Sequence, residues 1–336
     1  MIDNVIKFGI IGIGKIGTIH SQSSRQLNNT EFIAAYHPNI KKAKKFASSN
    51  KIKKLYDDLD SFLNNSEIYA IDICTPTHTH YDLIIKCLDA GKKVLVEKPI
   101  TRTLQEFDEL VKYIGNSSKN LMVAQYCRFI PEYKMAKKII ARGEIGTPIS
   151  VRAHRRVSAP IYGEWFFDEK KSGGIILDLM IHDIDAVIWM LGDSIKSIYS
   201  CANNFNLENF DTPDSVTVVI KFNKGTIATI SGTWILPKEF YTPNQLDTML
   251  EVFGEKGVIE INDRSDAFMK VFTSENGVRL QKTDPLKIYK AEISHFSNCL
   301  LKNESFQMDF NSIRLSLDTC LKALESYKTG EIIKNE

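Results

Sequence analysis

A lysine and an acidic residue follow a short apolar run of the sequence. The run from Lys93 to Val96 is typical of a strand, and Glu97, Lys98 and Pro99 come directly after it. In an open parallel sheet, ligands bind beyond the carboxyl ends of the strands, so Lys98 is predicted to lie in a crevice. There its ammonium group can shuttle a proton or hold a substrate hydroxyl. A strand-end salt bridge to Glu97 is the structural alternative.

A glycine-rich loop follows the first apolar run, Ile6 to Ile11. Residues 12 to 17 read G-I-G-K-I-G and lead into a helical pattern, the context in which G-x-G-x-x-G indicates dinucleotide binding. The first glycine permits a tight turn, the second lets a pyrophosphate approach, and the third lets helix and strand pack closely. The N-H groups and the positive dipole end of the helix favour phosphate. Cofactor contacts are therefore predicted at Gly12, Gly14, Lys15, Ile16 and Gly17.

A histidine stands where many NAD-binding proteins carry an acidic residue. The second apolar run ends at Tyr36, and His37 follows it. A carboxylate there would bind the ribose hydroxyls of NAD and repel the 2′-phosphate of NADP. His37 is predicted to lie beside the cofactor ribose, and Lys41 and Lys42 downstream make NADP plausible or are simply solvated. The sequence therefore predicts NAD or NADP without choosing between them.

Hydroxyl and imidazole groups follow the next apolar run, Tyr69 to Cys74. Here backbone amides and hydroxyls can contact the cofactor ribose or phosphates, and a threonine can cap the next helix. A plain strand-to-helix turn with exposed histidines is the alternative. The predicted cofactor contacts in these strand-end segments are Thr75, Pro76, His80, Glu97 and Lys98.

An acid and an imidazole interrupt an apolar segment, 175 to 191, that is predicted to be a helix. Asp178, His182, Asp185 and Trp189 are spaced to share one stripe of it. Asp178 can accept from one ring nitrogen of His182 and leave the other free to act as a general base. A buried pair that only satisfies itself is the alternative. Asp185 is expected to support the pair, and no metal site is predicted, because the expected ligand spacing is missing.

Two basic residues alternate along a predicted strand before this helix. In a strand from Pro148 to Arg156, His154 and Arg156 lie on one face and Arg155 on the other. If that face looks into a cleft, Arg156 can bind a carboxylate, a phosphate or vicinal hydroxyls. Solubility of an exposed strand is the alternative.

The elements that must position these residues change in kind near residue 125. Up to Ala124, apolar strands alternate with helices, which predicts a doubly wound parallel sheet of the Rossmann type. After it, several strands follow one another without crossover helices, which predicts an α+β domain with a largely antiparallel open sheet. We therefore expect a dinucleotide-binding domain at 1–124 and a substrate-binding and oligomerisation domain at 125–336, with the site between them.

Composition excludes several classes of protein. The 336 residues are 43% hydrophobic and 25% charged, which is an ordinary balance for a globular protein, and the net charge of +2 gives no field to recruit nucleic acid or a membrane surface. The six cysteines form no C-x-x-C, and no apolar run approaches the ~18 residues of a membrane span. A cytoplasmic location is predicted. Apolar strand residues such as Val218, Ile220, Ile227 and Ile230 suggest a face buried in a homodimer or homotetramer.

Together these motifs resemble the Gfo/Idh/MocA family of oxidoreductases. The resemblance rests on the glycine loop, Thr75-Pro76, residues 91 to 99, Arg128-Phe129, and Gly173-Gly174 with Asp178 and His182, in that order along the chain. It implies a nicotinamide-dependent redox step on a sugar, sugar derivative or cyclic polyol. Lys98, Asp178 and His182 match the catalytic positions. The implied substrate contacts are Lys98, Arg128, His154, Arg156, Asp178 and His182.

The sequence departs from the family pattern at two positions, and the family includes two other functions. Arg156 stands where inositol dehydrogenases carry asparagine, which suits an acidic or phosphorylated sugar better than inositol, and His37 replaces the usual acid. The family also includes a non-catalytic sensor and NAD-dependent glycosidases. A sensor has no need of Lys98, Asp178 and His182 together. Net formation of reduced cofactor would distinguish a dehydrogenase from a glycosidase.

Overall fold

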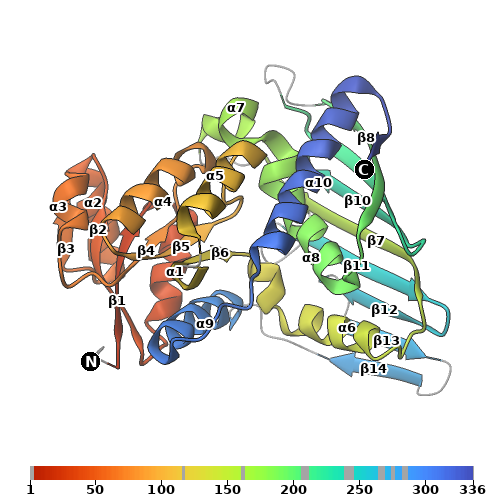
Figure 1. Cartoon of the computed structure of the whole chain (residues 1–336), viewed down its shortest axis with the longest axis horizontal. Helices are drawn as coiled ribbons and strands as arrows, with labels where there is room; N and C mark the ends of the chain where they lie inside the picture. Colours follow the sequence, from red (N-terminus) through yellow and green to blue (C-terminus); the bar gives the residue numbers. More distant parts are fainter. Residues whose placement is uncertain are drawn as a thin grey trace. The chain divides into compact units, whose positions relative to one another are not determined.

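Two sheets organise the chain, one in each of two units (Figure 1). The computed structural model describes residues 4–115, 118–159, 163–205, 212–237, 246–263, 269–273, 277–281 and 287–335. The first unit comprises Met1–Phe129 and Pro285–Phe310, and the second comprises Ile130–Asp284 and Asn311–Glu336. Each is described by itself below. No helix among the described residues is both long enough and apolar enough to cross a membrane.

The first unit holds a parallel sheet with strand order β3-β2-β1-β4-β5-β6. Its strands are β1 Ile6–Ile11, β2 Thr30–Tyr36, β3 Lys54–Tyr56, β4 Ala70–Ile73, β5 Lys93–Glu97 and β6 Leu121–Ala124. Its helices are α1 Lys15–Ser24, α2 Ile40–Asn50, α3 Leu59–Leu63, α4 His80–Asp89, α5 Leu104–Ile114 and α9 Ile288–Lys302. This order, which reverses between β1 and β4, confirms the predicted doubly wound sheet. Both β3 and α3 were missed in the sequence because they are only three and five residues long.

Local chemistry explains where several of these helices begin. Thr103 accepts from the backbone N-H of Glu106, whose side chain accepts in return from the backbone of Thr103, so α5 starts with a capping box. Asn39 accepts from two backbone N-H groups at the start of α2. These caps fix the helix starts that follow the carboxyl ends of the strands.

Helix α9 packs against the first sheet although it comes late in the sequence. The Phe296 ring centroid lies 5.7 Å from that of Phe8 in β1, and Phe8 stacks on Phe32 of β2 at 5.0 Å. Ile293 and Leu300 belong to the same buried cluster. The predicted division at residue 124 assigned this helix to the second domain, whereas its contacts place it in the first unit. An apolar stripe in the sequence does not say which sheet will cover it.

The second unit holds a nine-stranded sheet in the order β14-β13-β12-β11-β7-β10-β9-β8-β15. The strands are β7 Pro148–Val157, β8 Ile195–Asn203, β9 Ser215–Phe222, β10 Ile227–Thr233, β11 Leu246–Gly254, β12 Gly257–Asn262, β13 Met269–Thr273, β14 Gly277–Gln281 and β15 Ile333–Lys334. Among these pairs only β7 and β10 run parallel, so the predicted largely antiparallel sheet is confirmed. The helices are α6 Pro131–Ala141, α7 Glu169–Ser172, α8 Ile181–Leu191 and α10 Phe310–Thr329.

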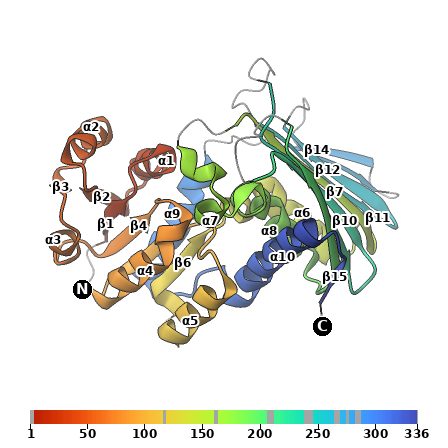
Figure 2. The same cartoon turned by 90° about the horizontal axis from the view of Figure 1, so that it is seen from above.

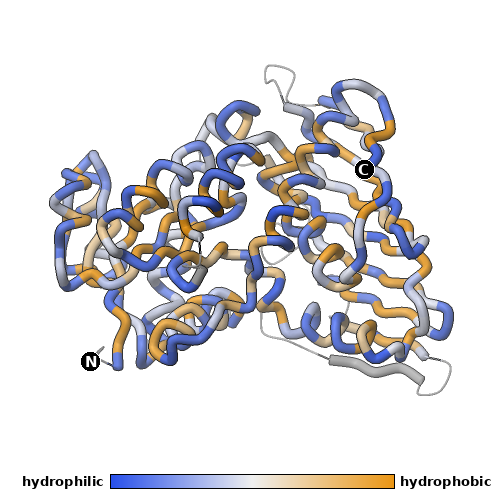
Figure 3. Tube along the Cα trace, in the orientation of Figure 1, coloured by the Kyte–Doolittle hydropathy of each residue, from blue (hydrophilic) through white to orange (hydrophobic). Residues whose placement is uncertain are grey.

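One face of this second sheet is covered by helices. Figure 2 shows α6, α8 and α10 on the same side of it, and Figure 3 shows hydrophobic residues recurring along the strands. Val218, Ile220 and Ile230 are fully buried, whereas Ile227 is 45% exposed. The expectation that all four lie on an open face was therefore wrong for three of them, because in strands successive residues alternate between faces. Of these four residues, only Ile227 lies on the face of the sheet that points away from the chain's own core.

A buried ion pair fixes α8 to this sheet. Arg155 of β7 and Asp183 of α8 are almost fully buried, with Nε to Oδ2 at 2.7 Å and Nη2 to Oδ1 at 3.0 Å. Arg155 therefore points to the helix-covered face, and the predicted alternation puts His154 and Arg156 on the other. Asp183 carried no signal in the sequence, since it reads as one acid among several in the segment H-D-I-D.

We expect the Asp183→Asn substitution to lower the free energy of unfolding by about 3–5 kcal/mol, because it leaves a buried guanidinium without its charge partner. Chemical denaturation of the full chain measures the change. The control is Glu251→Gln, which removes an ion pair from Arg152 that is 4.0 Å long and solvent-exposed on the arginine side. That variant should lose less than about 1 kcal/mol. Equal losses in the two variants would contradict this assignment.

Candidate active site

The glycine loop has the geometry that the motif predicts. Gly12 has φ of +102°, and a Cβ there would lie 2.4 Å from the backbone of Cys74. A Cβ on Gly17 would lie 2.1 Å from the carbonyl oxygen of Gly12, so both positions require glycine. A Cβ on Gly14 would meet nothing within 4 Å. Gly14 is thus open on the side from which a ligand would approach, at the start of α1.

The predicted cofactor residues of three adjacent strands follow the carboxyl ends of those strands. Strands β1, β4 and β5 are neighbours and parallel, so the loops after Ile11, Ile73 and Glu97 open at one edge of the sheet. Lys15 and Ile16 open α1, and Thr75 and Pro76 lie in the loop after β4. The structure therefore gathers the predicted dinucleotide contacts of the first unit at one edge, where α/β sheets bind ligands.

His37 keeps one ring nitrogen for a ligand. Its Nδ1 accepts from the backbone N-H of Asn39 at 2.8 Å. Burial, together with the charge of Lys42, lowers the pKa of His37, so the neutral ring with a proton on Nε2 is favoured. That N-H can donate to a ribose hydroxyl. Lys42 lies close enough to act on His37, which keeps NADP possible alongside NAD.

His80 is placed differently from what its position in the sequence suggested. It is 1% exposed, and its Nδ1 and Nε2 each lie 2.8 Å from a carbonyl oxygen, of Pro99 and Thr75 respectively. Burial lowers the pKa of His80. Because both nitrogens face the main chain, the predicted direct polar contact with the cofactor is corrected to a supporting role. His80 joins the two loops that carry Thr75 and Lys98.

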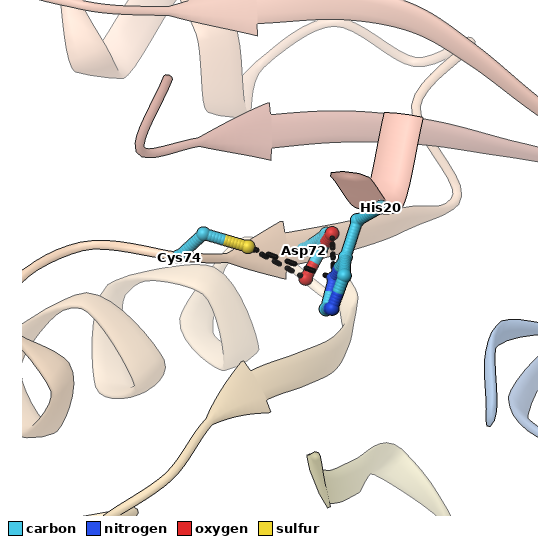
Figure 4. A group of neighbouring side chains, drawn as sticks. All are labelled: His20, Asp72 and Cys74. Atoms are coloured by element: carbon cyan, nitrogen blue, oxygen red, sulfur yellow. Dashed lines mark hydrogen bonds and ion pairs between the residues drawn. The ribbon is translucent and has the colours of Figure 1, made fainter. Parts of the chain in front are cut away.

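A buried histidine that no sequence motif marks contacts strands β4 and β5. His20 of α1 has no exposed surface, and its Nδ1 lies 2.9 Å from Asp72 Oδ2 in β4. Figure 4 shows the two side chains facing each other. Its Nε2 lies 3.3 Å from Glu97 Oε1. The Cys74 thiol donates to Asp72 Oδ1 at 3.4 Å. Burial alone would lower the pKa of His20, but the charge and hydrogen bond of Asp72 outweigh it and raise the pKa well above its usual value.

Three of these groups have donor atoms that a metal ion could use. The donor atoms of His20, Asp72 and Cys74 all lie within 4.8 Å of one another. However, burial raises the pKa of Cys74 well above its usual value, which favours the thiol over the thiolate that a metal requires. The direct bond between His20 Nδ1 and Asp72 Oδ2 already engages two of the three donor groups. The arrangement is thus complete as a hydrogen-bonded cluster.

Helix α9 contributes a buried acid to the same region. Glu292 is fully buried, and no described residue hydrogen-bonds to either of its oxygens. Burial raises its pKa well above the usual value, and the charges of Glu97 and Asp72 act in the same direction. Tyr289, one turn earlier, has its ring centroid 5.5 Å from that of His20. A charged residue on an otherwise apolar stripe, next to Ile293 and Phe296, was the available signal in the sequence.

We expect the Glu292→Gln substitution to stabilise the protein increasingly as the pH rises. Above the ordinary carboxyl pKa the unfolded chain loses this proton while the folded chain keeps it, so the native state loses stability with rising pH. A glutamine side chain stays neutral in both the folded and the unfolded chain, so it does not cause this loss of stability. The midpoint of thermal unfolding should rise by a few degrees at pH 8 and stay unchanged near pH 4. The exposed Glu304→Gln is the matched control, and an equal shift at both pH values would contradict the assignment.

The segment with Asp178 and His182 is not one regular α-helix. Residues Ile176–Met180 form a π-helix, and α8 begins at Ile181. A π-turn winds more residues into each turn than an α-helix, so the rotation between Asp178 and the residues of α8 differs from that of the regular helix that was predicted. Asp178 is partly exposed and His182 is 8% exposed. π-turns inside helices occur frequently at functional sites.

Asp185, which was expected to support the pair, also connects two helices of the second unit. It is fully buried and accepts from the hydroxyl of Ser316 in α10 at 2.8 Å. Trp189 lies under the ammonium group of Lys137, which is 4.6 Å from its ring centroid. Both residues thus hold neighbouring helices of the second unit to α8.

His154 and Arg156 meet around one carboxylate. His154 Nε2 lies 3.2 Å from Asp247 Oδ1, and Arg156 Nη1 lies 3.5 Å from Asp247 Oδ2. Asp247, in β11, is fully buried and was not selected in the sequence. Its charge offsets part of the positive charge that Arg156 would offer to an anionic substrate. His154 is 7% exposed, and Arg156 remains 42% exposed on its side chain.

Two further predicted contacts belong to the first unit. Lys98 follows β5, is partly exposed, and precedes Pro99 through a cis peptide bond. Arg128 lies in the 3-10 helix Tyr126–Phe129 and is 1% exposed. The structure thus keeps Lys98 at the strand edge where the glycine loop opens, and buries Arg128.

Comparisons with known proteins assign the chain to a family. A family model described as "Oxidoreductase family, NAD-binding Rossmann fold" matches residues 6–125, and one described as "GFO/IDH/MocA C-terminal domain" matches residues 133–260. The first match lies within the first unit and the second within the second unit. The chain therefore belongs to the Gfo/Idh/MocA family of NAD(P)-dependent oxidoreductases, and the predicted resemblance is confirmed.

Curated relatives and a solved structure agree with this assignment. The chain is 27% identical to "Myo-inositol 2-dehydrogenase" of Thermotoga maritima over 82% of this chain and 80% of the relative. It is 26% identical to "scyllo-inositol 2-dehydrogenase (NAD(+))" of Bacillus subtilis over 98% and 96%. A structure titled "Levoglucosan dehydrogenase, complex with NADH and levoglucosan" matches with a TM-score of 0.86 at 21% identity, covering 98% of this chain and 99% of that one, which shows the fold.

Proposed function

We propose that this protein transfers a hydride between a nicotinamide cofactor and a secondary alcohol or ketone of a sugar, sugar derivative or cyclic polyol. The observation that carries the proposal is the glycine loop open at Gly14, beside a strand end that presents Lys98. Relatives named as inositol dehydrogenases support the substrate class. A cytoplasmic location fits such a role.

The open position at Gly14 and the N-terminus of α1 fit a pyrophosphate, and His37 fits the cofactor ribose. Gly12, Lys15, Ile16, Gly17, Thr75 and Pro76 would complete the contacts, with Glu97 and Lys98 beside the nicotinamide. Bound NAD(P) supplies the hydride acceptor or donor. The chain's own residues must hold the alcohol and handle its proton.

In the proposed mechanism Lys98 donates a hydrogen bond to the reacting hydroxyl, and His182 accepts the hydroxyl proton as the C-H bond breaks. The alcohol then becomes a ketone. The hydrogen on the reacting carbon leaves as hydride, and the hydroxyl hydrogen leaves as a proton that His182 takes up. Asp178 orients the imidazole and offsets the charge that it gains. Arg128, His154 and Arg156 are proposed to contact the remaining hydroxyls.

A homodimer or homotetramer is also proposed. Within the described ranges, the face of the second sheet opposite α8 carries no helix, and it exposes apolar residues such as Ile227, Phe253 and Phe272. Such a face is suited to a second copy of the chain. Light scattering at micromolar concentration tests this, and a monomer would contradict it.

Binding and turnover assays test the proposed function. NADH and NADPH are titrated separately, and a panel of cyclic polyols and sugars is then added with the oxidised cofactor while nicotinamide absorbance is followed. A dehydrogenase accumulates reduced cofactor in equal amount with ketone. Binding without turnover of any panel member would favour the sensor, and release of a free sugar without net reduced cofactor would favour the glycosidase.

A further inference from the structure

The buried cluster around His20 links the dinucleotide helix to the strand end that carries Lys98. His20 comes three residues after Gly17, on the helix whose N-terminus faces the proposed pyrophosphate site. Asp72 lies on β4, and Glu97 ends β5. One side chain thus reaches across three elements that all border the cofactor edge of the sheet.

Both ring nitrogens of His20 face carboxylate oxygens. Nδ1 lies 2.9 Å from Asp72 Oδ2, and Nε2 lies 3.3 Å from Glu97 Oε1. A neutral imidazole has one N-H and one lone pair, and its lone pair would face the carboxylate that it cannot donate to. The imidazolium has two N-H groups and directs one at each carboxylate. The buried Nε2 makes no well-aligned hydrogen bond, so its 3.3 Å approach to Glu97 is a charge contact, which a proton on each nitrogen makes favourable.

Glu97 is held at both of its oxygens. Oε1 faces His20, and Oε2 accepts from the backbone N-H of Lys98 at 3.1 Å. The carboxylate thus bridges α1 to the peptide that joins residues 97 and 98. Burial alone would raise the pKa of Glu97, but the close approach and charge of His20, together with the charge of Lys98, lower it. Without the imidazolium, this carboxylate would lose its strongest stabilising partner.

The other titratable groups around His20 do not replace its charge. The other titratable groups that interact with His20 are Cys74 after β4, and Tyr289 and Glu292 of α9. Burial raises the pKa of each of these three, which disfavours their charged forms. Among the residues named here, His20 is the one that can carry a positive charge. It faces the carboxyl groups of Asp72 and Glu97.

We propose that His20, as an imidazolium, is a positioning residue that keeps Glu97 ionised and thereby fixes Lys98 for the reaction. This rests on the proposed function, in which Lys98 contacts the reacting hydroxyl. His20 itself touches neither substrate nor cofactor. It ties the middle of helix α1 to the segment that presents the lysine.

The test compares His20→Gln, Glu97→Gln and the double variant with the wild type across pH. Glutamine can still donate to Glu97 but carries no charge, so the Glu97 carboxylate becomes harder to ionise. In His20→Gln we expect kcat to fall about 10–100-fold at pH 7, with NADH affinity within about 3-fold of wild type. The acid limb of the pH-rate profile should move up by about one pH unit or more, so that activity partly recovers at high pH. A merely structural defect lowers kcat without moving that limb.

The double variant decides whether His20 acts through Glu97. If it does, the loss in kcat of the double variant equals that of Glu97→Gln alone, since there is no carboxylate left to hold. If the fold-losses in kcat of the two single variants multiply in the double variant, the proposal is overturned. His295→Gln, in α9 of the same unit, is the histidine control and should leave the pH profile unchanged.

A measurement on the wild-type chain keeps the proposal testable if His20→Gln does not fold. The ¹⁵N chemical shifts of the His20 ring should show both nitrogens protonated at pH 7 to 8. A neutral tautomer would overturn the proposal, and so would a zinc ion bound at Nδ1, which metal analysis of the purified chain would reveal. Failure of the wild type to oxidise any polyol would defeat the proposed function while leaving these ring shifts as expected, so the two failures can be told apart.

Discussion

Replacing Lys98 by methionine, or His182 by asparagine, is expected to lower kcat by about 10²–10⁴-fold while NADH affinity changes little. Methionine keeps the length and most of the volume of lysine but cannot donate to the substrate hydroxyl. Asparagine keeps polarity but cannot take up the hydroxyl proton. Steady-state kinetics and fluorescence titration with NADH measure the two quantities separately.

Matched variants make this result specific. Lys93→Met changes the lysine at the other end of the same strand, and His295→Asn changes a histidine of α9. Both should keep turnover near that of the wild type. Retained turnover in Lys98→Met and His182→Asn together would remove the proposed catalytic roles, even if the cofactor still binds.

Replacing Gly14 by valine is expected to weaken NADH binding by on the order of 100-fold without unfolding the protein. Gly14 has φ of −78°, which any residue adopts, and a Cβ there meets no protein atom within 4 Å. The added side chain would instead fill the space that a pyrophosphate needs. Isothermal titration gives the affinity, and thermal unfolding without cofactor shows whether the fold is kept.

The control for Gly14→Val is Gln22→Val, on the exposed side of the same helix. It introduces the same side chain into α1 away from the loop, so NADH affinity should stay close to that of the wild type. Unchanged affinity in Gly14→Val would mean that the dinucleotide does not approach this loop.

The sequence was most informative where one residue type is required by local geometry. Gly12 and Gly17 are required because a Cβ would collide with backbone atoms, and the motif therefore predicted both the turn and the ligand that it serves. The doubly wound parallel sheet followed from alternating strands and helices, because right-handed crossovers leave few alternatives. For the same reason the edge carrying Lys98 was predicted correctly.

What the sequence could not supply was tertiary pairing. Asp72 reads as one polar residue in an apolar strand, and its partner His20 lies 52 positions earlier. Glu292 joins the same cluster from a helix that comes almost 200 residues after β5. The π-turn before α8 was equally hidden, since its residues have the same apolar pattern as an α-helix. Buried charges of this kind become recognisable only when the elements that carry them pack together.

The most direct test of the central claim follows the hydrogen that leaves the substrate. A polyol that the protein oxidises is prepared with deuterium on the reacting carbon and incubated with the oxidised cofactor. Direct transfer predicts one deuterium at C4 of the nicotinamide for each ketone formed, with none released to water. Deuterium in the solvent, or ketone formed without reduced cofactor, would contradict hydride transfer at this site.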